Sequence, residues 1–151
     1  MWASEYGHLD IVRELLERGA NVNAARADDG MTSLMLASWD GHLEIVRELL
    51  GRGVNVNAAQ TDDGKTSLMW ASECGHLEIV RELLGRGAAV NAACTGDGST
   101  PLMFSCKNDH LETARLLLQH GASKTAVDTA GKTAYKHTSA ASAALRKLVK
   151  P

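Results

Sequence analysis

Four histidines recur along the chain at equal intervals and are the first candidates for metal or acid–base chemistry. His8, His42, His76 and His110 are thirty-four residues apart, and an apolar run follows each of them. If each belongs to one of a series of packed helices, neighbouring histidines are about 8–10 Å apart. A single zinc ion needs nitrogen ligands at about 2 Å. These histidines therefore predict no shared metal site, and we expect them to have a structural role where a helix begins.

Two segments end like a phosphate-binding loop but lack its other glycine. Gly64-Lys65-Thr66 and Gly131-Lys132-Thr133 have the Gly-Lys-Thr ending, yet alanine occupies the position five residues before the glycine in both. The loop needs glycine there, because its backbone must approach the phosphates closely. A turn followed by a helix cap explains both segments, and we expect no nucleotide cofactor.

The acidic pairs and the cysteines also form no catalytic or metal-binding set. Asp28-Asp29 and Asp62-Asp63 offer few oxygens, whereas one calcium ion takes about six to eight. Cys74, Cys94 and Cys106 make no Cys-x-x-Cys pair, so we interpret them as free thiols in the cytoplasm or nucleus. No nucleophile elbow occurs either. The sequence predicts no catalytic residue, no metal and no cofactor, and a protein that is not an enzyme.

The composition excludes further classes. The 151 residues carry a formal net charge of −2, whereas nucleic-acid-binding domains usually have a basic face. No run approaches the ~18 apolar residues of a membrane span. Hydrophobic residues make up 44 % and aromatic residues only 4 %, which favours many small contacts between aliphatic side chains. We expect a monomer that binds neither nucleic acid nor membranes.

Internal repetition supplies the elements that position all these residues. Residues 41–53 recur unchanged as 75–87, with a close copy at 7–19 and a looser one at 109–121. Repeats of this length indicate a stack in which each unit covers its neighbour. The predicted division is a truncated first repeat at 1–29, repeats at 30–63, 64–97 and 98–130, and a C-terminal capping repeat at 131–151.

Each unit reads as two helices and a long loop. Thr32 and its copies Thr66, Thr100 and Thr133 precede apolar runs and suit a helix N-cap. The pattern predicts a short helix near 33–40 and a second near 43–52 with one apolar stripe. Alternating Val and Asn followed by Asp-Gly over 54–65 indicates a strand and turn. Tetratricopeptide units, which have a similar period, leave little room for so long a loop.

On these motifs the sequence resembles the ankyrin-repeat family, over essentially the whole chain. The family pattern Thr-Pro-Leu-His-x-Ala corresponds to the segments 32–37, 66–71 and 100–105. Met replaces the family's His, so its hydrogen bonds cannot be carried over, and Ser replaces Pro twice. The resemblance implies an all-α repeat solenoid, an ankyrin-like stack of helix–helix–β-hairpin units. It also implies a non-catalytic module that binds a partner protein through its concave groove and hairpin tips.

The resemblance also implies which positions face the partner. They are the exposed ends of the first helices, the residues after the turn glycines, and the hairpin tips. In this sequence those positions are Glu5, Tyr6, Trp39, Asp40, Glu73, Cys74, Lys107 and Asn108, then Met31, Lys65 and Ser99, and finally Arg26, Gln60 and Thr61.

Among these residues Trp39 is the leading anchor, because tryptophan is enriched in interface hot spots. The alternative is that Trp39 folds over its own hairpin. Trp2, Trp70 and Phe104 share another register of the repeat with Leu36, and a position that is apolar in every copy predicts core. Small residues on the first helices predict that the stack curves towards them.

Two other interpretations remain open. The identical blocks also fit an engineered or selected scaffold, although Ser33 and Ser67 depart from an idealised repeat. The chain could instead be a regulatory arm of a larger enzyme. Because Met1 aligns with the middle of a first helix, we expect a piece cut from a longer array or an exposed first repeat.

Overall fold

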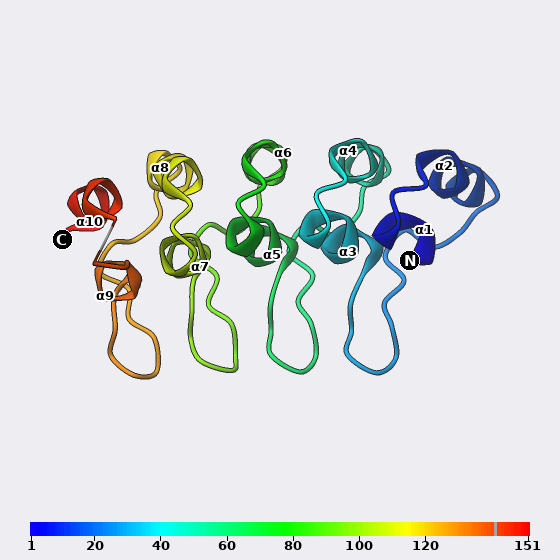
Figure 1. The fold of residues 1–151 in the computed structure, drawn as a ribbon. Helices are drawn as coiled ribbons and strands as arrows, with labels where there is room; N and C mark the ends of the chain where they lie inside the picture. Colours follow the sequence, from blue (N-terminus) through cyan, green and yellow to red (C-terminus); the bar gives the residue numbers. More distant parts are fainter. Residues whose placement is uncertain (141) are drawn as a thin grey trace.

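A computed structural model describes residues 1–140 and 142–151; residue 141, within the expected capping repeat, lies outside the described residues. The helices form two parallel rows, and the hairpins project from the inner row on the side away from the outer row (Figure 1). This confirms the predicted helical stack. The inner row comprises α1 (Trp2–Glu5), α3 (Ser33–Trp39), α5 (Ser67–Cys74), α7 (Pro101–Lys107) and α9 (Ala134–His137), and the outer row α2 (Leu9–Glu17), α4 (Leu43–Gly51), α6 (Leu77–Gly85), α8 (Leu111–Gln119) and α10 (Ala143–Val149).

Threonine occupies the N-cap position of the inner helices from α3 onward, as predicted, but its side chain makes the expected capping bond only in α3 and α5 and not at Thr100 or Thr133. The Oγ1 of Thr32 accepts the N–H of Met35 at 3.3 Å, and the methionine sulfur accepts the N–H of Thr32 at 3.5 Å. Thr66 and Met69 repeat this reciprocal pair in α5. Thioether sulfur is a weak acceptor, yet here it satisfies a backbone N–H at a position where we expected the family's hydrogen bonds to be lost.

The hairpins contain less β-structure than the sequence predicts. Among the described residues the pairing is limited to isolated bridges, Ala25 with Thr32 and Ala59 with Thr66. The Val-Asn run of residues 54–57 forms no strand, and its last two residues lie in a turn. The prediction of a strand there is wrong because asparagine serves another purpose: the Oδ1 of Asn57 accepts the N–H of Ala89 in the next unit at 2.8 Å.

Three of the four repeated histidines, His42, His76 and His110, join their unit to the one before it. The Nε2 of His42, His76 and His110 lies 2.8–2.9 Å from a carbonyl oxygen at the end of the preceding inner helix. A carbonyl only accepts, so Nε2 carries the proton in each ring. The predicted structural role of the histidines is confirmed.

The hairpins are joined in the same stepwise way. The backbone N–H groups of Thr61, Thr95 and Thr129 donate to carbonyl oxygens in the preceding hairpin, at 2.7–3.0 Å. Gly30, with φ of +74°, permits this contact, because a Cβ there would be 2.9 Å from Thr61. The hairpin row is therefore held at a fixed spacing.

One hydrophobic core runs through the stack between the two rows. Ala37 and Ala71 are fully buried, and inner helices contact each other more extensively than outer helices do. This difference agrees with the predicted curvature, since small side chains permit closer approach. On α2, Ile11 and Leu15 are exposed, although their counterparts in the next two units are buried. Within residues 1–140 and 142–151, no helix is long and apolar enough to cross a membrane.

Candidate functional site

The inner helix ends and the hairpins form one side of the stack, which we call the inner strip (Figure 1). Of the fourteen residues predicted to face a partner, six are exposed, five are half-buried and three are buried. The exposed ones are Tyr6, Trp39, Asp40, Thr61, Lys107 and Asn108; the half-buried ones are Glu5, Arg26, Lys65, Glu73 and Cys74; the buried ones are Met31, Gln60 and Ser99.

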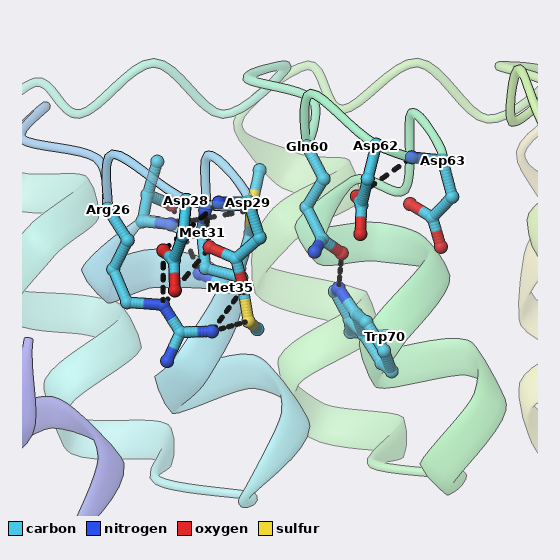
Figure 2. A network of polar contacts seen from close by, with 10 residues as sticks. Arg26, Asp28, Asp29, Met31, Met35, Gln60, Asp62, Asp63 and Trp70 are labelled. Carbon is cyan, nitrogen blue, oxygen red and sulfur yellow. Dashed lines mark hydrogen bonds and ion pairs between the residues drawn. The ribbon is translucent and has the colours of Figure 1, made fainter.

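Two of the three buried residues, Met31 and Gln60, support groups at the surface of the strip. Met31 packs with Met35 and Leu36 in a small cluster under the first complete hairpin. The Oε1 of Gln60 accepts the indole N–H of Trp70 at 2.8 Å (Figure 2). Both side chains therefore orient surface groups but offer little surface themselves.

An aromatic row occupies the middle of the inner strip. Trp39 of α3 stacks on Trp70 of α5, with ring centroids 4.6 Å apart and planes inclined by 18°. Trp39 nevertheless remains 43 % exposed. It lies on the neighbouring unit and not over its own hairpin, so it is both held in place and accessible.

The half-buried ammonium group of Lys65 continues this row. The Nζ of Lys65 lies 4.0 Å from the ring centroid of Trp70 and 5.0 Å from that of Phe104. It also pairs with the carboxylate of Glu73 at 3.0 Å. We call Trp39, Trp70, Lys65 and Phe104 the aromatic row.

The prediction that Trp2, Trp70 and Phe104 lie in the core, because they share a repeat position with Leu36, is only partly confirmed. Leu36 and Phe104 are buried, but Trp70 is half-buried and Trp2 is 77 % exposed. The core prediction is therefore wrong for Trp2, whose ring is tilted beside Tyr6 at 6.2 Å on the outermost unit. Trp70 is only half-buried, and its indole N–H donates to the side chain of Gln60.

The acidic residues of successive hairpins have different hydrogen-bond partners. Arg26 binds Asp29 through both guanidinium branches and also lies 3.7 Å from Asp28 (Figure 2). The hydrogen bond from Arg26 and that from the N–H of Met31 lower the pKa of Asp29 to about 2. In a later hairpin, the thiol of Cys94 donates to Asp97 at 2.8 Å and lowers the pKa of that carboxyl to about 2.

The hairpin between these two carries acidic groups without such partners. The carboxylate of Asp62 accepts the N–H of Asp63 at 2.8 Å (Figure 2), and that of Asp63 accepts the N–H of Lys65 at 2.8 Å. None of the ion pairs among the described residues involves Asp62, Asp63, Asp40 or Glu5. On the outer row, by contrast, Arg–Glu pairs bridge neighbouring units. The N-terminal half of the inner strip is therefore acidic.

The cysteines are poor nucleophiles in this arrangement. Burial raises the pKa of the Cys74 thiol, and the carboxylates of Glu73 and Asp40 raise it further. Burial raises the pKa of Cys106 to about 12. Within the described part of the chain, no three His, Cys, Asp or Glu side chains gather as a metal site would require. The strip can offer shape, aromatic faces and charge to another molecule.

Sequence reasoning missed the partnership of Trp39 with Trp70. The two residues are thirty-one positions apart, three less than one repeat. Because residues three apart on a helix share a face, this spacing brings the end of one inner helix beside the preceding turn of the next. The same spacing relates Glu73 to Phe104, which Lys65 joins, so the spacing was a usable signal.

Comparison with known proteins agrees with this geometry. A sequence profile describing three copies of the ankyrin repeat matches residues 1–94 and again residues 90–150. The two matches together cover almost the whole chain. A search of curated proteins found no match.

Proposed function

The chain belongs to the ankyrin-repeat family, and we propose that it is a non-catalytic module that binds a partner protein along its inner strip. Repeats of this family generally serve protein interaction. The observation that carries the proposal is the aromatic row, which presents the half-exposed ring of Trp39 in a fixed position. We further propose the five units 1–29, 30–63, 64–97, 98–130 and 131–151, and action in the cytoplasm or nucleus, where the free cysteines stay reduced.

Rigidity supports the proposal. Binding costs less when the binding groups are already ordered. Backbone hydrogen bonds from Thr61, Thr95 and Thr129 join each of their hairpins to the hairpin before it. Trp39 is held against Trp70, so its large apolar face is available without further loss of side-chain freedom. Large aromatic residues in such positions dominate the energetics of many interfaces.

We propose that the contact surface centres on Trp39 and Asp40. Tyr6 and Glu5 extend it towards the first unit, and Cys74 towards the third. The remaining residues of the proposed surface are Arg26, Thr61, Lys65, Glu73, Lys107 and Asn108, with Met31, Gln60 and Ser99 supporting them.

A peptide selection tests the proposal. The whole chain, immobilised, is used to select binders from a displayed library of random peptides, and amide hydrogen exchange then maps where a selected peptide binds. We expect protection of the hairpins and inner helices, and binding at least about tenfold weaker to Trp39→Ala. Arg81→Ala on the outer row is the control and should bind normally. Failure to select any peptide, or protection confined to the outer row, would contradict the proposal.

A further inference from the structure

We propose that the inner strip takes a basic segment of its partner, with one arginine side chain stacked on the outward face of Trp39. This inference rests on the proposed function and names the chemistry of the partner. Three features of the strip support it: an exposed aromatic ring, a cation already bound by the same row, and carboxylates that form no ion pair among the described residues.

The open face belongs to the ring at the end of the aromatic row. Lys65 lies over both Trp70 and Phe104 of the following unit, whereas Trp39 comes from the preceding unit. Because Trp70 covers one face of Trp39, the other face and the edges of the ring are left to supply its 43 % exposure.

The chain itself shows how this row holds a cation. The ammonium group of Lys65 lies over the ring of Trp70 at 4.0 Å and pairs with Glu73 at 3.0 Å. A ring face beside a carboxylate is thus a working cation site in this strip. Trp39 has the same ingredients, because Asp40 follows it directly and Glu5 occupies the matching register of α1.

Arg26, the arginine of the inner strip, is bound elsewhere and does not stack on Trp39. Arg26 is held within its hairpin by Asp29, by Asp28 and by the sulfur of Met31. Lys65 is likewise committed to Glu73.

The carboxylates of the strip that form no ion pair indicate the charge of the bound segment. Glu5, Asp40, Asp62 and Asp63 take part in none of the ion pairs formed by residues 1–140 and 142–151, although Glu5 is near enough to Arg26 to help raise the pKa of that guanidinium. Complementary charge steers association and fixes register, so this half of the strip favours a cationic segment. Arginine is preferred over lysine, because its planar guanidinium both stacks on indole and binds a carboxylate through two N–H groups.

The test uses the peptides selected with the whole chain. We expect arginine to be enriched over its frequency in the library, and replacement of the key arginine by citrulline, which is close in shape but uncharged, to weaken binding about fivefold or more. Replacement by lysine should weaken it less than citrulline does. These changes are made in the peptide and do not depend on the folding of a variant.

Variants of the chain locate the arginine. Trp39→Leu keeps an apolar side chain but removes the ring face, so it should bind the arginine and citrulline peptides equally, whereas Trp39→Phe should retain part of the preference. Trp2→Leu, at another exposed tryptophan, is the matched control and should retain it fully. Selected peptides without arginine enrichment, or a preference that survives Trp39→Leu or is lost in Trp2→Leu, would overturn the inference and leave the proposed function standing. Failure to select any peptide would overturn both.

Discussion

Replacement of Gly75 by alanine should destabilise the stack far more than replacement of Gly87, although both residues have left-handed backbone conformations. Their φ angles are +75° and +81°, so alanine suffers similar backbone strain at each, about 1–2 kcal/mol. The difference lies in the surroundings. A Cβ on Gly75 would lie 2.5 Å from Nδ1 of His110, whereas a Cβ on Gly87 meets nothing within 4 Å.

The extra cost can be estimated from the contact. Overpacking typically costs about 1–3 kcal/mol, because the imidazole of His110 must move and weaken its bond to the carbonyl of Glu73, now 2.9 Å. Gly75→Ala should therefore lower the free energy of unfolding by about 2–5 kcal/mol and Gly87→Ala by about 1–2 kcal/mol. Asp109 supports this assignment: it occupies the same register in the fourth unit with φ of +58°, so the conformation itself accepts a side chain.

Urea denaturation at 25 °C, followed by circular dichroism, measures both losses, and a double-mutant cycle identifies their cause. In a His110→Ala background the imidazole is absent, so Gly75→Ala should cost no more than Gly87→Ala. Equal losses for the two single variants would refute the reasoning. An excess for Gly75→Ala that persists without the imidazole would refute it as well.

Three other predictions concern stability and thiol reactivity. Asn57→Ala removes two side-chain bonds to the next unit and should lower the free energy of unfolding by about 1–3 kcal/mol in the same urea assay; Asn55→Ala, which removes a bond within its own turn, should cost less. The pKa of Asp97 is about 2 in the folded chain, below its usual value of 3.8, so its ionisation stabilises the fold above about pH 4 and this contribution is lost as pH falls towards 2. Asp97→Asn keeps an acceptor but does not titrate, so its stability relative to the parent should improve between pH 5 and pH 2.5. Iodoacetamide at pH 8 should modify half-buried Cys74 before Cys106, whose pKa is about 12; mass spectrometry of digested samples measures the order, and earlier labelling of Cys106 would contradict its burial.

The repeat made most of the fold predictable. Each unit after the first has a threonine at the N-cap of its inner helix, and the expected helices 33–40 and 43–52 differ from the observed ones by a single residue at the C-terminal end. The strand expected over 54–57 did not form, since the side chain of Asn57 bonds to the next unit instead. Strand propensity describes only the local preference of the backbone. The bond of Asn57 depends on Ala89 of the next unit, thirty-two residues further along the chain.

The site was less predictable, because aligning copies gives each register one average environment. That averaging placed Trp70 in the core with Phe104, although Gln60 and Trp39 give it a different surrounding. It also placed Met31 on the surface with Lys65, although Met31 is buried. Residues that differ between the repeats indicate which surface is variable. Only the contacts between neighbouring repeats show which of those side chains are exposed on that surface.

The ladder of bonds between units has an evolutionary consequence. Excision of residues 41–74 at the gene level would leave His76 to bond Glu5 and His110 to bond Trp39, so every junction would find an equivalent partner. The same event would remove Trp70 and Lys65 and bring Phe104 beside Trp39. Unequal recombination between the identical blocks can therefore rewrite what the surface recognises in one step, while the architecture that presents it is inherited intact.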